Sequence, residues 1–324
     1  MKNFESFLAP QLNEYLAYRQ NMGYSIKVSR SHLLIFDRYL KQTNAEWKTL
    51  QPFFFLEMRA NIEMESRAMN SVFYSMRVFF QFLLRRDYVV ENPLQDIPPL
   101  KENSIIPFVF SPAETGQFLE AVCKKVRRSE KHFLMDLAIY MALLLLARCG
   151  MRISEPLKLM RDHYRRDDGT VYIEKTKFKK QRLIPVPKAA MTEIENYLSV
   201  RQSLRPHDQD PYLLAGRNKG PLTPEQLRYV FRKTLKEIGL DQPRRVIGNL
   251  NFSQPTPHSL RHSFAVNTLK EIKERGESPQ HALPVLAAYM GHSEYKYTSV
   301  YLRVADALSR KNLVDFALWQ KRKE

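Results

Sequence analysis

The chain is poor in the residues that build several common kinds of site. It has only two cysteines, Cys123 and Cys149, among 324 residues. Two cysteines make no disulfide framework and are typical of a protein from a reducing compartment. Glycine is also scarce, with 10 residues, and the sequence contains no glycine-rich phosphate loop.

Long hydrophobic runs are absent as well. The most apolar stretch, residues 137–147, is 11 residues long and lies between Asp136 and Arg148. It is too short to span a bilayer and predicts a buried helix instead. The first residues include an acid, Glu5, and lack the apolar segment of a signal peptide. We therefore expect no membrane association and a cytoplasmic location.

Positive charge is abundant and unevenly distributed. The chain has 51 Lys and Arg against 34 Asp and Glu, a net charge of +17. Residues 1–100 hold 12 basic and 10 acidic side chains, or +2, so the remaining 39 and 24 give +15 for residues 101–324. Such a field favours a polyanionic partner. Charge alone leaves anionic lipid and ribosomal contacts open as alternatives.

The pattern of apolar residues predicts two domains. Helical spacing runs through residues 1–90. Four prolines within residues 91–107 then indicate a linker. We predict an N-terminal helical domain at 1–92, a linker at 93–108 and a second domain at 109–324.

The second domain is expected to be mostly helical with a small β element. Ser111 followed by Pro112 is typical of a helix start. Residues 166–187 contain short β-rich runs on both sides of a lysine-rich turn, which predicts a small sheet or hairpin. From Pro221 onward the spacing is helical again, apart from a polar loop expected around residues 242–256. The predicted fold class is mainly α with a small β-sheet.

A few polar residues stand out as candidates for chemistry. His258 and Arg261 are three residues apart and share a face of a predicted helix. Arg152 directly follows the buried helix, where a cation needs a partner, and Glu155 can provide it. Metal binding is the rival interpretation for the histidines, but neither cysteine is near His258 or His292. We expect no metal and no cofactor.

Six residues in this order resemble the signature of the tyrosine recombinases, the site-specific recombinases of the lambda-integrase type: Arg152 in "CGMRISE", Lys177 in "EKTKFKKQRLIP", His258 and Arg261 in "PHSLRHSFA", His292 in "MGHS", and Tyr301 in "VYLRV". The resemblance covers about half of the chain. It implies a helical, SAM-like core-binding domain that binds DNA, followed by a mixed α/β catalytic domain with a C-terminal tail helix.

The resemblance selects one tyrosine among three. In this family the nucleophile follows the histidine at the spacing that separates Tyr301 from His292, whereas Tyr295 and Tyr297 come too early. Tyr301 is therefore expected to form a 3′-phosphotyrosyl link to DNA. The two other tyrosines are interpreted as packing or DNA-facing residues.

The chemistry of a phosphodiester fits the remaining candidates. Arg152 and Arg261 offer forked, permanently charged donors to the phosphate oxygens. A phenol is mostly protonated at neutral pH, so it needs a base, for which His258 is the candidate. Lys177 is expected to protonate the leaving 5′-oxygen, and His292 to donate a hydrogen bond to a non-bridging oxygen.

Neighbours of these residues receive other interpretations. Lys177 is preferred as the general acid because its position, counted back along the sequence from "RLIPVP", agrees best with the family pattern. The other lysines of the turn are expected to bind DNA phosphates: Lys175, Lys179 and Lys180. His262 is interpreted as a packing histidine that points elsewhere on the helix.

The expected function is site-specific recombination of duplex DNA by a homotetramer through a Holliday junction, at the nucleoid. A type IB topoisomerase, or a DNA-binding regulator without catalytic activity, is the alternative. The tail is expected to dock either on its own domain or, as in the family it resembles, on a neighbouring protomer through Leu313, Phe316 and Leu318.

Overall fold

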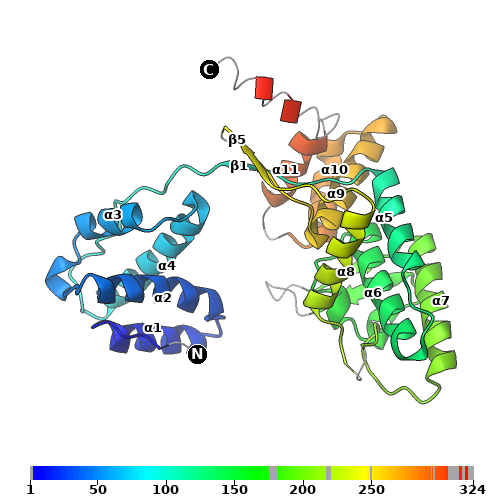
Figure 1. Ribbon diagram of the computed structural model, residues 1–324, viewed down its shortest axis with the longest axis horizontal. Coiled ribbons are helices and arrows are strands. Elements are labelled where there is room, and N and C mark those ends of the chain that lie inside the picture. The colour runs from blue at the N-terminus through cyan, green and yellow to red at the C-terminus, as the bar shows by residue number, and fades with distance from the viewer. Residues whose placement is uncertain are drawn as a thin grey trace. The chain divides into compact units, whose positions relative to one another are not determined.

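The computed structural model describes residues 3–174, 181–216, 220–248, 250–292, 294, 296–305, 314, 315, 318 and 319. The chain forms two compact units, Met1–Asn103 and Ser104–Glu324 (Figure 1). Four prolines near this boundary predict a linker at 93–108.

From residue 3 onward, the first unit forms four α-helices and a short 3-10 helix: α1 (Ala9–Asn21), α2 (Lys27–Gln42), η1 (Trp47–Thr49), α3 (Pro52–Asn61) and α4 (Ser66–Arg85). Its core is rich in aromatic side chains, and Phe36, Phe55 and Phe80 from three helices are fully buried and in mutual contact. Large apolar rings at helical spacing on α2 and α4 therefore supply the packing that holds the helices together.

The segment expected as a linker is shared between the units. Leu94 and Ile97 are buried in the core of the first unit. The Arg77 guanidinium donates from Nε to the Leu94 carbonyl (3.0 Å) and from Nη2 to the Ile97 carbonyl (2.9 Å), which fixes this stretch against α4. The later residues Ser104–Ile106 form strand β1 of the second unit.

The described part of the second unit contains the α-helices α5 (Pro112–Lys124), α6 (Glu130–Arg148), α7 (Lys188–Leu204), α8 (Pro224–Glu237), α9 (Pro257–Glu274), α10 (Pro279–Met290) and α11 (Lys296–Ala305). Two short 3-10 helices, η2 (Pro156–Lys158) and η3 (Arg161–His163), follow α6. The prediction of a buried helix is confirmed, since α6 buries every residue from Ala138 to Ala147. The predicted start of α5 is also confirmed, because the Ser111 hydroxyl caps Glu114 N at 3.1 Å.

The described residues of this unit also form two small sheets. The first contains β2 (Tyr164–Arg165), β3 (Thr170–Ile173) and β4 (Arg182–Pro185), all antiparallel, with Ile173 opposite Arg182. This confirms the predicted hairpin, although residues 175–180 of its turn, including all four candidate lysines, lie outside the described residues.

The second sheet corrects an expectation. It has the order β1–β6–β5, with β5 (Arg245–Ile247) and β6 (Leu250–Phe252) antiparallel and β1 parallel to β6. These strands occupy the stretch around residues 242–256 that was expected to be only a polar loop. That expectation was wrong because the partner strand β1 lies far away in the sequence, and local patterning does not reveal such a pairing.

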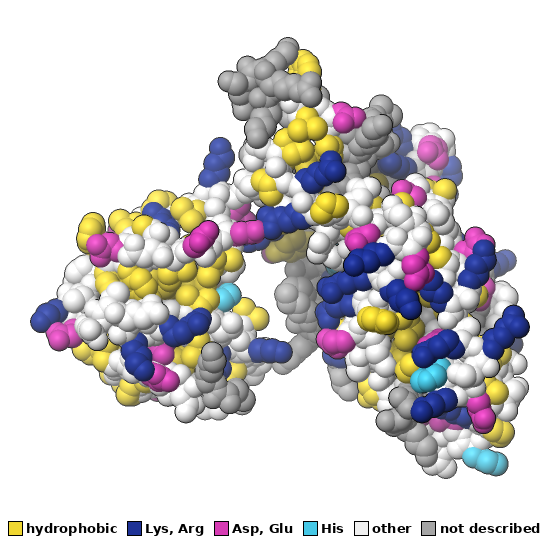
Figure 2. Space-filling model, viewed as in Figure 1, with side chains coloured by type: hydrophobic (Ala, Val, Ile, Leu, Met, Phe, Trp, Pro, Cys, Tyr) yellow, Lys and Arg dark blue, Asp and Glu magenta, His cyan; other side chains and the backbone are white. Residues whose placement is uncertain are grey.

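The predicted fold class, mainly helical with a small β element, is confirmed. None of the helices in the described parts of the chain is long and apolar enough to cross a membrane. Figure 2 shows many Lys and Arg side chains on the visible face of the second unit, as the uneven charge predicts.

Candidate active site

Three helices near the end of the second unit carry most of the candidate residues. α9, α10 and α11 contact one another and are drawn in orange and red in Figure 1. Pro257 occupies the first turn of α9, so the segment "HSLRH" lies in the first turns of this helix. The loop after α6 and strand β4 add one arginine each. Residues from these five parts of the chain therefore meet.

Arg261 is the most deeply buried of the charged candidates, with 1% of its surface exposed. Its Nη1 donates to the Gly150 carbonyl at 2.5 Å, and its Nη2 donates to the Met290 carbonyl at 2.6 Å. Burial and the nearby Arg152 lower the pKa of Arg261 to about 9, so it stays cationic at neutral pH. A guanidinium has more N–H donors than these two bonds use, so Arg261 can bind a further acceptor.

Two glycines make this close arrangement possible. Gly150 has φ of +55°, and a Cβ there would lie 2.4 Å from the Phe264 ring. Gly291 ends α10 with φ of +65°, and a Cβ there would lie 2.9 Å from Nη1 of Arg182. Both positions combine a left-handed backbone with no room for a side chain, which only glycine tolerates.

A buried carboxylate joins the two other arginines. Glu155 accepts from Nη1 of Arg152 at 2.9 Å and from the Arg152 backbone N–H at 2.8 Å. Both of its oxygens also accept from Arg182, at 3.0 and 2.9 Å. The Arg152 Nη2 reaches the Gly291 carbonyl at 2.6 Å. The predicted pairing of Arg152 with Glu155 is thus confirmed. Three guanidinium groups around one carboxylate leave a site with excess positive charge.

Tyr301 points into this cluster from α11. It is 3% exposed, and its hydroxyl lies 2.9 Å from Nδ1 of His262. The expectation that His262 points elsewhere was wrong. Residue 262 is one helical turn beyond His258, so both histidines lie on one face of α9, and His262 contacts α11. Burial raises the pKa of Tyr301, against the opposing effect of Arg261 and Arg152.

His258 lies beside this pair. Its ring packs edge-on against the His262 ring, with centroids 4.5 Å apart. Part of the His258 side chain is exposed, but dense protein around the ring, followed by the charge of Arg261, lowers its pKa to about 4. Within the described residues, the Tyr301 hydroxyl bonds to His262 and not to His258.

His292 approaches from the turn between α10 and α11. Its Nδ1 lies 2.7 Å from the Thr298 hydroxyl, and its ring centroid lies 6.2 Å from that of Tyr301. Burial and the charge of Arg261 lower the pKa of His292 to about 4, so the ring is neutral at physiological pH. The bond from buried Thr298 fixes which ring nitrogen faces the site.

The structure thus brings Arg152, His258, Arg261, His292 and Tyr301 together. Tyr297 is half exposed, and its hydroxyl donates to Glu294 at 3.3 Å. Tyr295 and the four hairpin lysines, Lys175, Lys177, Lys179 and Lys180, lie outside the described residues.

Sequence reasoning missed Arg182, His262 and Thr298. Only His262 had a sequence signal, its spacing of four residues from His258, which places the two side chains on one helix face. That spacing also suits a pair of metal ligands. However, no group of three or more His, Cys, Asp and Glu side chains that could hold a metal occurs in the described part of the chain.

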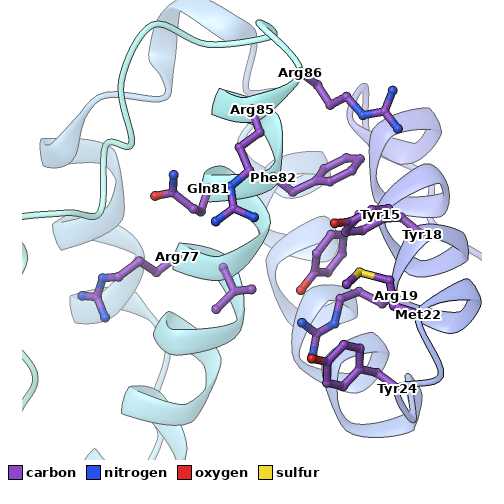
Figure 3. Close-up of a pocket in the computed structure, with 11 residues that line it drawn as sticks. Tyr15, Tyr18, Arg19, Met22, Tyr24, Arg77, Gln81, Phe82, Arg85 and Arg86 are labelled. Carbon is purple, nitrogen blue, oxygen red and sulfur yellow. The ribbon is translucent and has the colours of Figure 1, made fainter.

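A second candidate surface lies on the first unit. A pocket of about 510 Å³ between α1 and α4 is lined by basic and aromatic side chains (Figure 3). Arg19 stacks over Tyr24 at 3.9 Å, Arg86 lies 3.8 Å from Glu14, and Arg77 is engaged with carbonyl groups as described above. Among the described residues Arg85 has no hydrogen-bond or ion-pair partner, so its charge is available to an external anion.

Buried guanidinium groups, neutral histidines and a tyrosine hydroxyl define a class of site, one that binds a phosphodiester and attacks it with a phenol. Comparison with known proteins agrees with this class. The model of the phage integrase family matches residues 110–307, which is more than half of the chain. The chain belongs to the phage integrase family and is a tyrosine recombinase.

Relatives match over almost the whole chain. The tyrosine recombinase XerA of Pyrococcus furiosus is 25% identical over 314 residues, which is 94% of each chain. The structure of XerH recombinase bound to a palindromic difH substrate, a post-cleavage complex, has a TM-score of 0.68 and 20% identity over 96% of this chain and 84% of that chain. A lambda integrase tetramer bound to a Holliday junction has a TM-score of 0.63 and 15% identity over 89% and 77%. These neighbours share the fold, and the relatives favour a recombinase over a topoisomerase or a regulator.

Proposed function

We propose that the chain cleaves and rejoins duplex DNA at specific sites, with Tyr301 as the attacking group. The observation that carries this proposal is the position of the Tyr301 hydroxyl. It is buried beside two histidines, in the cluster that holds Arg152 and Arg261. A tyrosine that only packs needs no such cluster of cations. A tyrosine that attacks a phosphate does, because negative charge on the phosphate repels nucleophiles and must be offset.

The arginines are the groups that bind the scissile phosphate. Arg261 is rigid, because carbonyl groups on two elements hold it. Arg152 is held by Glu155 and the Gly291 carbonyl. Donors fixed before the substrate arrives stabilise the transition state without reorganisation. His292, fixed by Thr298, donates to a non-bridging oxygen, and Lys177 protonates the leaving 5′-oxygen.

The reaction conserves energy in a covalent bond. Attack by the Tyr301 oxygen on phosphorus forms a 3′-phosphotyrosyl link and releases a 5′-hydroxyl. The reverse attack by a 5′-hydroxyl restores the phosphodiester and frees the tyrosine. Strand exchange therefore needs no nucleotide cofactor, and fixed cations supply the electrostatic stabilisation that a metal supplies elsewhere.

DNA contacts extend to both units. The first unit is proposed as the core-binding domain, with Arg85 in the pocket of Figure 3 as a phosphate contact. Lys175, Lys179 and Lys180 of the hairpin turn bind further phosphates. The net charge of +15 in residues 101–324 supports a DNA partner. Binding to chromosomal DNA places the protein at the nucleoid.

Assembly is proposed to follow that of the neighbours. The lambda integrase structure is a tetramer on a Holliday junction, and we infer a homotetramer for this chain on paired sites. The C-terminal tail then docks on a neighbouring protomer. Such a cyclic contact joins identical subunits head to tail.

Detection of a covalent adduct tests the proposed function. Genomic fragments that bind the protein are nicked close to the bound site. After cleavage, the short piece that carries the free 5′-hydroxyl then dissociates, so the strand cannot be rejoined. After denaturation, protein linked to a DNA 3′ end is expected, with the DNA remnant on the peptide that contains Tyr301. A linkage to another residue, or binding without any adduct, contradicts the proposal.

A further inference from the structure

Tyr301 makes its hydrogen bond to a residue outside the six that the family signature names. The Tyr301 hydroxyl lies 2.9 Å from Nδ1 of His262, with ring centroids 5.5 Å apart. His262 is on α9 and Tyr301 is on α11, two helices that pack on each other. The contact is therefore set by tertiary packing, which holds the imidazole at hydrogen-bond distance from the oxygen that attacks DNA.

We propose that His262, and not His258, is the base that removes the Tyr301 proton during cleavage and returns it during rejoining. The inference rests on the proposed function, because it assigns a role within that reaction. In the free protein His262 carries its ring proton on Nε2, and Nδ1 accepts the hydrogen bond from the phenol. A neutral imidazole offers one such acceptor nitrogen.

The proton and electron balance is simple. The Tyr301 O–H bond breaks, the proton moves to Nδ1 of His262, and the oxygen keeps the electron pair that forms the new bond to phosphorus. The bond from phosphorus to the 5′-oxygen breaks, and that oxygen takes a proton from the general acid, Lys177. During rejoining, the imidazolium of His262 acts as the general acid and protonates the departing phenolate of Tyr301.

The charges around His262 make its basicity depend on whether DNA is bound. The groups that face the His262–Tyr301 pair are His258 and Arg261 on α9, His292 in the turn before α11, and Arg152 in the loop after α6. Burial, followed by the nearby His258, Arg261 and His292, lowers the pKa of His262 to about 3 in the free protein. A scissile phosphate adds negative charge between the guanidinium groups and stabilises the imidazolium. Proton transfer is thereby favoured when DNA is bound.

The other two histidines are placed for different tasks. His258 keeps an exposed side, and its ring contacts the His262 ring edge-on, so its polar atoms are free to meet DNA. Nδ1 of His292 is engaged with Thr298. In the described residues only His262 has a ring nitrogen bonded to the Tyr301 hydroxyl.

A first experiment determines the tautomer of His262 in the protein without DNA. Nitrogen NMR of protein with isotope-labelled histidine distinguishes protonated from unprotonated ring nitrogens, and the His262 signals are those lost in His262→Asn. We expect an unprotonated Nδ1 that responds to Tyr301→Phe. A proton on Nδ1 at neutral pH overturns the inference, since that nitrogen would then donate to the tyrosine.

A second experiment measures cleavage with a strand that carries sulfur at the 5′-bridging position. A thiolate leaves without protonation, so the general acid no longer limits the rate and the base step is isolated. His262→Asn keeps a polar acceptor near the Nδ1 position but removes the base. We expect adduct formation to slow about a hundredfold or more at neutral pH, with the defect shrinking as pH rises and the phenol ionises unaided. The exposed His281 on α10 provides the control His281→Asn, which should cleave at the normal rate.

The possible results distinguish a role of His262 as the base from a structural role and from failure of the proposed function. A defect of equal size at every pH shows a purely structural role and overturns the inference. The same holds if His258→Asn shows the pH-dependent loss while His262→Asn cleaves normally. If the unmodified protein forms no adduct on any DNA, the proposed function fails and this inference fails with it.

Discussion

Both carboxylate oxygens of Glu155 accept hydrogen bonds from the guanidinium of Arg182, with Nη1–Oε1 at 3.0 Å and Nη2–Oε2 at 2.9 Å. The Arg182 Nε also donates to the Tyr289 carbonyl at 2.8 Å, so the pair ties strand β4 to α10. The same carboxylate orients Arg152. Glu155 therefore couples the phosphate-binding arginine to the rigid framework of the second unit.

Loss of this carboxylate should strongly destabilise the protein. Glu155→Ala leaves buried guanidinium groups without a counter-charge, and breaking a buried pair in this way costs about 3–5 kcal/mol. We expect a fall of that size in the free energy of unfolding, measured by urea denaturation. The matched control is Glu225→Ala, which removes an exposed carboxylate 3.0 Å from Arg228 and should cost less than about 1 kcal/mol.

The pH dependence of stability gives an independent reading of Glu155. Burial opposes its ionisation, but the hydrogen bonds and charge of Arg182 outweigh burial and hold its pKa below the ordinary value of 4.5. A depressed carboxyl pKa stabilises the folded state above pH 4.5, and the contribution is lost as pH falls through the folded value. Glu155→Gln should therefore flatten the acid limb of the stability profile. An unchanged acid limb would show that other carboxylates dominate it.

Tyr301→Phe removes only the attacking oxygen. DNA binding should persist, whereas the covalent adduct and strand exchange should vanish. Tyr297→Phe is the control within the same helix, since that hydroxyl bonds to Glu294, and Tyr295→Phe is a second control. Both controls should still form adduct. An adduct retained by Tyr301→Phe and lost in either control would reassign the nucleophile.

A change of the leaving group from oxygen to sulfur distinguishes the general-acid role of Lys177 from the DNA-binding role of the neighbouring lysines. Lys177→Ala should cleave ordinary DNA poorly and the 5′-sulfur strand well, because a thiolate departs without a proton. Lys179→Ala and Lys180→Ala should instead weaken binding and reduce its dependence on salt. If the sulfur strand rescues one of these two variants and not Lys177→Ala, the acid is that other lysine.

Arg85 tests the DNA role of the first unit. Arg85→Gln should lower DNA affinity and reduce the slope of log affinity against log salt by about one unit, as expected for one lost phosphate contact. Arg38 on α2 provides a comparison, because its Nε donates to the Leu34 carbonyl of its own helix at 3.1 Å. Equal salt slopes for Arg85→Gln and the unmodified protein would remove Arg85 from the interface.

The candidates found from sequence share one property: each has a distinctive local neighbourhood. "CGMRISE" and "MGHS" combine glycine turns with a charged or titratable residue, and the apolar run before Arg152 marks a buried helix. Periodicity gave the helices for the same reason, since a helix is determined largely by residues three and four apart.

The residues that were missed depend on contacts between distant segments. Arg182 reads as one more basic residue of the hairpin until β4 packs near α10 and places its guanidinium on Glu155. His262 was misread because its partner is 39 residues away on α11. Strands β5 and β6 were missed because their sheet needs β1 from the start of the second unit. Local patterns carry no information about such pairings.

The described residues of the C-terminal tail differ in how far the rest of the chain buries them. Val314 packs against the cluster of Ile247 and Phe252. Leu318 and Trp319, in contrast, are 39% and 51% exposed. Phe316 and Leu313, the other residues expected to dock, lie outside the described residues. Exposed Leu318 suits insertion into a neighbouring protomer, since burial of an apolar side chain stabilises an interface.

Substitution of exposed Leu318 tests docking in trans. Leu318→Ser should leave melting and single-site DNA binding unchanged while synapsis of two sites is lost, because the assembled complex buries this side chain. Val314→Ser is the matched comparison and should lower the melting temperature, because it disrupts a contact within the chain. Truncation after Ala307 should combine both effects. Melting, single-site binding and synapsis are measured side by side on each variant. Normal synapsis by Leu318→Ser, or a collapse of its melting, would show that the tail docks on its own domain.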